Sequence, residues 1–395
     1  MLNTREDELT KTKHEVWKPI SEDTLLIKAF SGLHSKFVSS SDIGGSTVLF
    51  RNATEMSNST SEFTYGTHST ASTRDLCSAL TELESASSTF LTSSGLQALT
   101  LPFFAFLTSG DHVLVSDSVY EPLRKFCKTI LPKFGVSVSF FDPKSLLNFK
   151  VLFRSRTKLV HLESPCSNTF EVINVDVIAR YSKTRNPNCI ISMDNSWATP
   201  FIFKPLNHGV DLSINALTKH VSGSSDHIIG SLSVNKIVHN IISVYHSILG
   251  FSVSNEHCID LLRSLKTTRQ RLELHHNSSL KIVNLLKQLP DVGKIYCPSI
   301  PSSFGHKIWL RDYKLLTGQI TFELVNTNRN ISSRERCELF LNKLQIFGLG
   351  WSWGGFKSLA SLVDNSQRVH TKPLAPPLIR LYIGLEHVGD LSWDL

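Results

Sequence analysis

The sequence has no hydrophobic run that could cross a membrane. Its longest apolar stretch, residues 99–107, is interrupted by Thr100 and Pro102, whereas a membrane-spanning helix needs about 20 consecutive apolar residues. The N-terminal residues are charged and lack the apolar core of a secretory signal. We therefore expect a soluble, cytoplasmic protein that does not insert into membranes.

Patterns that bind metals or form disulfides are also absent. The chain has 7 cysteines, an odd number, and no two of them form a Cys-x-x-Cys pair. Zinc sites and disulfide frameworks both depend on regular cysteine spacing, so we expect reduced thiols and no metal site. His275 and His276 are adjacent in the chain, and adjacent residues do not share one face of a helix.

Basic residues exceed acidic ones without forming a block. The formal net charge is +7, but Lys and Arg are scattered along the chain. Proteins that bind nucleic acids usually concentrate positive charge on one face or in one tail. The pattern therefore favours an anionic cofactor or substrate as the partner, and we expect no nucleic acid.

The length and composition fit an enzyme of two or three domains, because the chain has 395 residues, 41% of them hydrophobic and 19% charged. Residues 1–68 are rich in Ser and Thr and show no sustained periodicity, which predicts an extended N-terminal arm. From Leu76 onward, regular elements begin. We expect one domain at residues 69–258 and a second at residues 259–395.

Within residues 69–258, predicted strands alternate with predicted helices. Apolar runs predict strands at residues 113–115, 136–141 and 159–162, and two more strands that lead to Asp194 and Lys219. The spacing of apolar residues predicts helices at residues 96–107, 122–134 and 175–183. Such alternation is typical of an α/β fold, in which helices cover a mostly parallel sheet.

The pattern changes after residue 258. A long helical pattern runs through residues 259–289 and stops at Pro290. Beyond it we expect a strand at residues 320–324, a helix at residues 334–347 and a strand at residues 379–383. These elements predict a smaller C-terminal α+β domain.

Asp194 and Lys219 carry the most informative chemistry of the chain. Each follows an apolar run, and open α/β sheets bind ligands beyond the carboxyl ends of their strands. Either residue alone would be an ordinary loop residue. Together they meet the needs of pyridoxal phosphate (PLP): an amine that forms a Schiff base with the cofactor aldehyde, and a carboxylate that keeps the pyridine nitrogen protonated.

Other residues fit the same chemistry but are less specific. Ser94 and Gly95 precede a helix, whose first N–H groups can bind a phosphate or can simply be capped. Tyr120 is either an aromatic residue at the edge of the core or a ring stacked on the cofactor. Arg380 enters an apolar strand, where it is either solvated at the edge or pairs with a buried anion such as a substrate carboxylate.

In this order, these segments resemble the PLP-dependent enzymes of cysteine and methionine metabolism, the transsulfuration family of fold type I. The resemblance runs from about Tyr65 to Asp394 and rests on Ser94-Gly95, Gly110-Asp111-His112-Val113, Asp194-Asn195-Ser196-Trp197-Ala198-Thr199-Pro200, Thr218-Lys219, Gly223-Ser224-Ser225-Asp226 and Arg380-Leu381 through Gly384-Leu385-Glu386. It implies a PLP-dependent transferase fold with a mostly parallel, seven-stranded sheet and a smaller C-terminal α+β domain. It also implies a homotetramer built as a dimer of dimers.

The resemblance further implies roles for individual residues. Lys219 would carry the cofactor and move a proton at the substrate Cα, and Asp194 would pair with the pyridine nitrogen. The remaining expected contacts with the cofactor come from Tyr120, Gly95, Leu96 and Thr218, and from Tyr65 of a neighbouring subunit. Tyr120 and Tyr65 would also take part in catalysis. The substrate carboxylate would be bound by Arg380, Ser352 and Trp353.

Within the family, the chain is most similar to the branch that cleaves L-cystathionine by β-elimination in methionine biosynthesis. Tyr120-Glu121-Pro122, Trp197 and residues 352–356 carry this similarity. It implies that the products are homocysteine, pyruvate and ammonia. Two alternatives stay open: a γ-lyase, γ-synthase or homoserine-ester sulfhydrylase of the same family, or a PLP-free homologue with a structural role.

Two departures from the family pattern concern the cofactor phosphate. Thr67 stands where the family usually has an arginine that binds the phosphate of the partner chain, and His68 follows it. Ala216 stands where a phosphate-binding serine is usual. The residues at the reacting centre therefore resemble the family more closely than the residues that would bind the cofactor phosphate.

Overall fold

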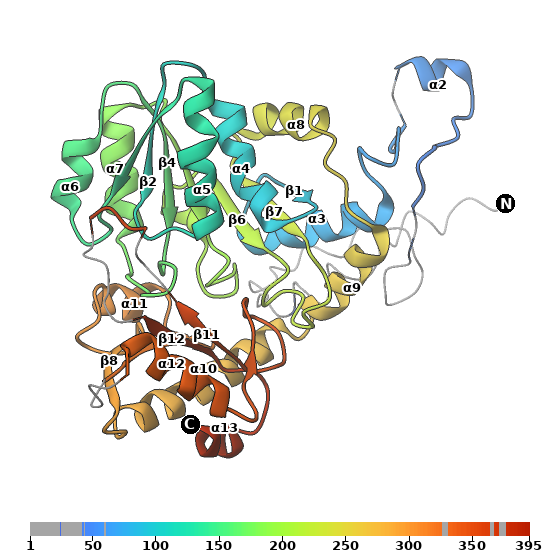
Figure 1. Ribbon diagram of the computed structural model, residues 1–395. Helices are drawn as coiled ribbons and strands as arrows, with labels where there is room; N and C mark the ends of the chain where they lie inside the picture. The colour runs from blue at the N-terminus through green and yellow to red at the C-terminus, as the bar shows by residue number, and fades with distance from the viewer. Residues whose placement is uncertain are drawn as a thin grey trace, which may run out of the picture.

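The protein is described by a computed structural model that covers residue 24, residue 42 and residues 44–58, 61–325, 331–363, 367–370 and 377–395. Most of the predicted arm lies outside these residues. The chain forms two β-sheets with their covering helices, one above the other in Figure 1. The larger sheet comes from the first two thirds of the chain and the smaller one from the last third.

The larger sheet has seven strands in the order β1-β7-β6-β5-β4-β2-β3. β7 runs antiparallel to both of its neighbours, β1 and β6, and the other four strand pairs are parallel, so the predicted mostly parallel sheet is confirmed. The strands are β1 (Ser88–Thr92), β2 (His112–Ser116), β3 (Ser137–Phe141), β4 (Thr157–Glu163), β5 (Ile190–Asp194), β6 (Leu212–Ala216) and β7 (Gly230–Val234).

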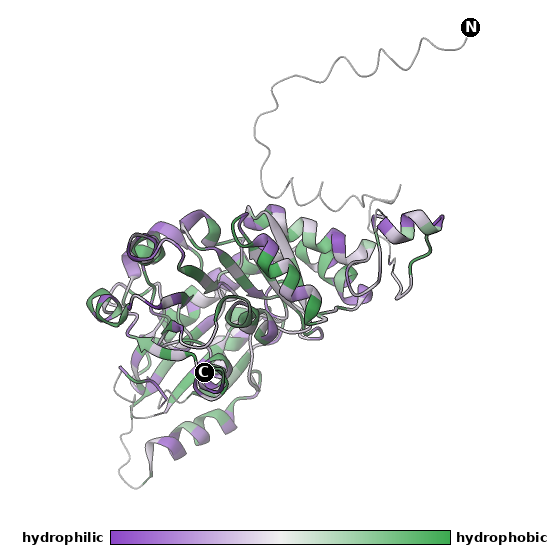
Figure 2. Ribbon diagram, turned by 90° about the horizontal axis from the view of Figure 1, so that it is seen from above, coloured by the Kyte–Doolittle hydropathy of each residue, from purple (hydrophilic) through white to green (hydrophobic). Residues whose placement is uncertain are grey.

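Both faces of this sheet are buried, which explains its continuous apolar runs. On β2, Val113 and Val115 pack in one hydrophobic cluster, while Leu114 between them packs in another. The helices are α3 (Ala71–Glu84), α4 (Gly95–Phe106), α5 (Glu121–Thr129), α6 (Leu146–Leu152), α7 (Val175–Arg185) and α8 (His239–Ile248). Figure 2 shows both hydrophobic and hydrophilic residues on the helices of the molecule, as expected for helices that cover a sheet.

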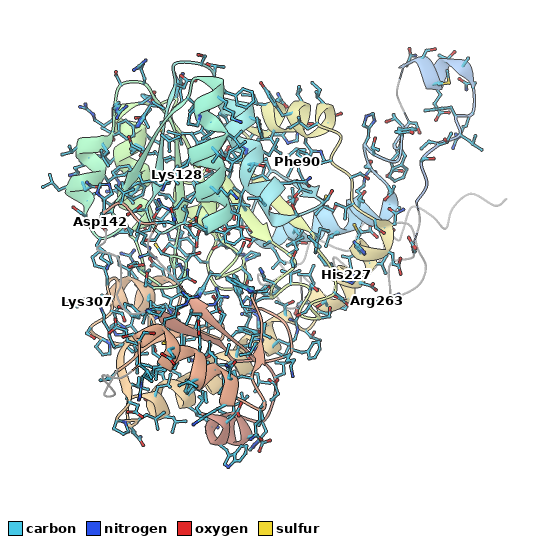
Figure 3. The ribbon with its side chains drawn as sticks, viewed as in Figure 1. Phe90, Lys128, Asp142, His227, Arg263 and Lys307 are labelled. Atoms are coloured by element: carbon cyan, nitrogen blue, oxygen red, sulfur yellow. The ribbon has the colours of Figure 1, made fainter. Side chains whose placement is uncertain are left out.

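The smaller sheet has five strands in the order β10-β11-β12-β9-β8. They are β8 (Val292–Tyr296), β9 (Gln319–Leu324), β10 (Gly348–Leu349), β11 (Leu359–Val363) and β12 (Leu378–Tyr382). The accompanying helices are α9 (Asn255–Leu265), α10 (Thr268–Leu286), α11 (His306–Asp312), α12 (Ser333–Lys343) and α13 (Val388–Asp394). In Figure 3, Asp142 of the larger domain and Lys307 of α11 lie on the two sides of the domain boundary.

Three predicted helices end earlier than the sequence pattern suggested, and each end has a physical cause. The single helix predicted at residues 259–289 is divided into α9 and α10. At the break, the carbonyl of Ser264 accepts from Arg271 Nη2 and Thr268 Oγ1. The pattern of residues 122–134 divides into α5 and a 3₁₀ turn that contains Pro132, which has no N–H to donate. The helix predicted at residues 334–347 is α12, which ends at Lys343.

Asp394 causes this last end. Its carboxylate accepts from the backbone N–H groups of Gln345, Ile346 and Phe347 at 2.7–2.9 Å. These three N–H groups therefore cannot continue α12. The predicted domain boundary at residues 258 and 259 falls inside α9, whose apolar face packs with α3 in one hydrophobic cluster.

Among the described residues, no helix is long and apolar enough to span a membrane. The same residues contain no group of three or more His, Cys, Asp or Glu side chains arranged to hold a metal ion. All 7 cysteines are free thiols, and all except Cys77 are buried.

Candidate active site

Lys219 lies between the two domains. It follows β6 in a tight turn, in which its N–H donates to Ala216 O at 3.0 Å. Its Nζ donates to Ser352 Oγ at 2.6 Å and lies 5.3 Å from the centre of the Trp353 ring. Burial and the positive charge of Arg380 together lower the pKa of the Lys219 amine to about 8. A larger fraction of this amine is therefore neutral, and able to accept a proton, than in an ordinary lysine.

Asp194 is the last residue of β5 and is paired in register with Ile214 of β6. Its Oδ1 accepts from Ser196 N at 2.9 Å. Burial raises the pKa of this carboxyl, while the hydrogen bonds from Ser196 and the charge of Lys219 oppose the rise. A buried carboxylate is costly without a cation or a donor beside it, so this position favours a positively charged ring nitrogen as its ligand.

Tyr120 stands at the N-terminus of α5, and 45% of its surface is exposed. Its backbone N–H donates to Glu163 Oε2 at 2.7 Å. Burial, Asp194 and Glu163 all raise the pKa of the Tyr120 hydroxyl. The backbone of Tyr120 is therefore fixed by Glu163, and its hydroxyl keeps its proton at neutral pH.

Arg380 comes from the smaller domain and faces Lys219 across the boundary. It lies on β12, opposite Ser361 of β11 and Thr321 of β9. Its guanidinium donates to Asn168 Oδ1 at 3.3 Å and to Ser352 O at 3.4 Å, and burial lowers its pKa to about 10. A half-buried guanidinium with long contacts to neutral acceptors is suited to bind a carboxylate.

The turn that carries Ser352 and Trp353 brings the backbones of the two domains into contact. Ser352 has a φ of +86° and Gly354 a φ of +90°. A Cβ atom at Gly354 would lie 2.7 Å from the Cα of Lys219. Only glycine fits at this position, and the close approach places Ser352 against the Lys219 amine.

A family model described as "Cys/Met metabolism PLP-dependent enzyme" matches residues 24–395. The chain belongs to this family. The cystathionine beta-lyase MetC of Escherichia coli is 36% identical over 342 residues, which cover 85% of each chain. An L-alanine/L-glutamate racemase of Wolbachia pipientis is 32% identical and covers 85% of this chain and 82% of its own.

A solved structure confirms fold type I, the PLP-dependent transferase fold, for this family member. Cystathionine gamma-lyase from Lactobacillus plantarum, solved as a complex with L-serine, superposes with a TM-score of 0.87. The superposition covers 95% of this chain and 97% of the other, at 24% sequence identity. The resemblance inferred from the motifs, the fold class and the PLP cofactor are thus confirmed.

The residues present fit PLP. At the start of α4, Ser94 Oγ accepts from Gln97 N, while the N–H groups of Gly95 and Leu96 belong to the first turn, which has no acceptors within the helix. A Cβ atom at Gly95 would lie 2.6 Å from the Cβ of Ala216, so glycine lets the end of β6 approach this N-terminus. An anionic phosphate is favoured here. Asp194 is the last residue of β5, and Lys219 follows the end of the neighbouring strand β6. With the phosphate bound at α4, the pyridine ring would lie beside Asp194 and the aldehyde beside Lys219.

Two predicted cofactor residues have other partners in the structure. The hydroxyl of Thr218 donates to Ile229 O at 3.1 Å and accepts from Ile229 N at 3.0 Å, so its single proton is already used. Tyr65 lies in the arm, forms a bridge with Thr47 and stacks edge-on with His68. The single chain does not bring Tyr65 to Lys219.

Sequence reasoning missed Glu163 and Asn168 as site residues. Glu163 bonds the Tyr120 backbone, and burial together with the charge of Asp194 raises its pKa to about 8. Asn168 has a φ of +66° and contacts Arg380. The only signal for Asn168 was its residue type, since asparagine tolerates positive φ better than most residues.

Proposed function

We propose that the protein cleaves L-cystathionine by β-elimination, as part of methionine biosynthesis, to give homocysteine, pyruvate and ammonia. One observation carries the proposal: the Lys219 amine contacts the Ser352 side chain while Arg380 contacts the carbonyl of the same residue. A base and a carboxylate-binding group thus meet at one residue. An α-amino acid bound by its carboxylate would present its Cα proton to Lys219.

Each residue contributes one action to this reaction. PLP, when bound, supplies an aldehyde for the substrate amine and a ring that draws electrons from Cα. Arg380, Ser352 and Trp353 bind and orient the α-carboxylate. Neutral Lys219 takes the Cα proton, and Lys219 or Tyr120 returns a proton to the departing sulfur. Asp194 holds the ring nitrogen protonated, and water then releases pyruvate and ammonia from the three-carbon fragment that remains.

Product analysis with purified protein, PLP and L-cystathionine tests this function. Pyruvate and homocysteine in equal amounts are the expected result. Formation of 2-oxobutyrate and cysteine would instead show γ-elimination. Conversion of L-alanine to D-alanine without pyruvate would point to the activity named for the Wolbachia relative, and no cofactor uptake at all would support a structural role.

Arg380→Lys is expected to raise KM for cystathionine by roughly a hundredfold. A lysine cannot reproduce the two-point fork of a guanidinium, and losing a hydrogen bond to a charged group costs about 1.5–3 kcal/mol. The cofactor absorbance should stay unchanged, because Arg380 contacts no expected cofactor group. Steady-state kinetics and spectra of both proteins provide the comparison. Loss of PLP at constant KM would instead assign Arg380 to the cofactor site.

The double variant Thr67→Arg with Ala216→Ser is expected to bind PLP about a hundredfold more tightly than the parent. A hydrogen bond to a charged group contributes about 1.5–3 kcal/mol and a neutral one about 1, and 2.7 kcal/mol corresponds to roughly a hundredfold. The dissociation constant is measured by equilibrium dialysis. Thr67→Gln with Ala216→Ser serves as the uncharged control, and equal constants for the double variant and the parent would count against the prediction.

The proposal includes a cytoplasmic homotetramer in which the arm of residues 1–68 brings Tyr65 to the site of a neighbouring subunit. Two features support assembly. Tyr65 lies in the arm, and 47% of its surface is exposed in the single chain. Residues on and beside α8 form an unusually apolar exposed surface: Ile237, Ile241, Val244 and Ile248 are exposed by 76%, 43%, 54% and 78%.

Light scattering is expected to give a mass of four chains. Val244→Asp with Ile248→Asp should give smaller particles, because two charges would be buried in an apolar interface. Leu339→Asp, at an exposed position of α12, is the control and should leave the mass unchanged. A mass of one chain for the parent protein would refute the assembly.

A further inference from the structure

A short segment of the smaller domain lies against the larger one. Residues 367–370 belong to the connection between β11 and β12, and in Figure 1 they form a short red piece beside the green helices and strands of the larger domain. Gln367, Val369 and His370 are exposed. The Arg368 side chain between them is only 6% exposed. One buried arginine in an exposed segment needs a specific partner.

The backbone of this segment is held by a buried ion pair of the larger domain. Asp117 and Arg124 pair with each other and are almost fully buried. The Asp117 carboxylate accepts from Val369 N at 2.9 Å and from His370 N at 2.7 Å. Arg124 Nη1 donates to Gln367 O at 3.1 Å. The hydrogen bonds of the pair to this segment all go to main-chain atoms, so they fix where the segment lies without using the Arg368 side chain.

The Arg368 guanidinium then binds a turn of the larger domain. Nη2 donates to Ser167 O at 2.8 Å and to Thr169 Oγ1 at 2.7 Å, and Nη1 lies 3.3 Å from Glu171 Oε1. Burial would raise the pKa of Glu171, but Arg368 and Lys144 outweigh it and hold that pKa below the usual value. The Glu171 carboxyl is therefore ionised at neutral pH.

Asn168 lies between Ser167 and Thr169, to which Nη2 of Arg368 donates. Its backbone is in the left-handed region, and its Oδ1 accepts from Arg380 Nη1. On the same turn, the hydroxyl of Ser167 donates to Glu163, the carboxyl that also holds the backbone of Tyr120. The Arg368 contacts thus fix a turn that touches both the carboxylate-binding arginine and the support of the stacking tyrosine.

We propose that Arg368 is a positioning residue for substrate binding: it fixes the turn of residues 167–169 so that Asn168 orients the Arg380 guanidinium toward the substrate carboxylate. This inference rests on the proposed function only in that the substrate is an α-amino acid. Arg368 contacts none of the expected cofactor groups, so it acts on substrate affinity and leaves the cofactor in place. A residue of an otherwise exposed segment thereby affects substrate binding at the site between the domains.

Arg368→Met is the main test, because methionine keeps an unbranched stem and removes the donors. The expected result is a KM for cystathionine raised about tenfold, with kcat within twofold and an unchanged absorbance of bound PLP. Arg336→Met is the matched control, since Arg336 pairs with Asp291 at 3.0 Å elsewhere in the smaller domain. It should leave KM unchanged. A fall in kcat at constant KM for Arg368→Met would overturn the proposal. If Arg368→Met does not fold, Arg368→Lys decides the question through the same split between KM and kcat.

A double-mutant cycle tests the route through Asn168. Asn168→Gly removes the side chain and still permits the positive φ. If Arg368 acts through Asn168, Arg368→Met should raise KM in the parent but not further in Asn168→Gly, because the contact that it orients is already lost. Additive effects on KM would refute the route.

Affinity for L-alanine provides a readout that does not depend on the reaction. L-Alanine has no leaving group at Cβ, and its binding is followed by the change in cofactor absorbance. Arg368→Met should weaken it about tenfold even if cystathionine is not cleaved, so failure of the proposed function would leave this test intact. Equal L-alanine affinities in both proteins would overturn the inference.

Discussion

Replacing Lys219 with alanine is expected to abolish cystathionine cleavage and to remove the visible absorbance of lysine-linked PLP. Lys219 is the lysine whose amine contacts Ser352 at 2.6 Å, between the residues that would bind the ring and the carboxylate. Its removal takes away both the attachment point of the cofactor and the base at Cα. We expect a fall in kcat of at least roughly ten-thousandfold, since proton transfer by a positioned base alone accounts for about 10²–10⁴ and the covalent role is lost as well.

Borohydride reduction followed by mass spectrometry checks this prediction directly. The parent protein should retain the mass of reduced cofactor on the peptide that contains Lys219, and Lys219→Ala should retain none. Lys236→Ala, which changes an exposed lysine close in sequence to the site, is the control and should behave as the parent. Substantial turnover by Lys219→Ala would remove Lys219 from the mechanism.

The second large effect is expected at Asp194. Asp194→Asn keeps an oxygen that can accept from Ser196 N but loses the negative charge. Without that charge the ring nitrogen would no longer stay protonated, and electrons from Cα would be drawn less strongly into the ring. We expect kcat to fall by roughly a hundredfold to a thousandfold, the usual size of such an electrostatic contribution.

Cofactor attachment separates this effect from that of Lys219→Ala. In Asp194→Asn, borohydride should still fix PLP to Lys219, since the amine is untouched. Asp176→Asn, on the exposed side of α7, is the control for loss of one carboxylate. A rate close to that of the parent would show that Asp194 serves only the fold.

Much of this architecture can be read from the sequence because the central strands are buried on both faces. Runs such as Val113-Leu114-Val115 and Cys189-Ile190-Ile191 leave few alternatives to a strand, and the polar residues that follow them must lie at one edge of the sheet. Strand β7, Gly-Ser-Leu-Ser-Val, was missed because its small polar residues lack that signal, although all five are buried.

Contacts between distant segments could not be predicted in the same way. The capping of three N–H groups by Asp394 and the contact of Arg368 with residues 167–171 join parts of the chain that no local pattern links. Propensity described α12 up to Lys343, and the long-range hydrogen bonds of Asp394 then decided where this helix ended. The position of Asn168 beside Arg380 belongs to the same class.

The two contacts of Arg380 have a consequence for ligand selection. In the free protein the guanidinium is already bound to Asn168 and to the carbonyl of Ser352. An incoming carboxylate therefore competes with the carbonyl of Ser352 for Nη2, while Asn168 keeps its contact with Nη1, and the affinity depends on the difference between a charged acceptor and a neutral one. That difference is about 1 kcal/mol per hydrogen bond, or roughly fivefold in affinity. Amines and esters carry no anionic oxygen, so they gain no binding free energy when they replace an internal acceptor. The site therefore discriminates against them without any steric barrier.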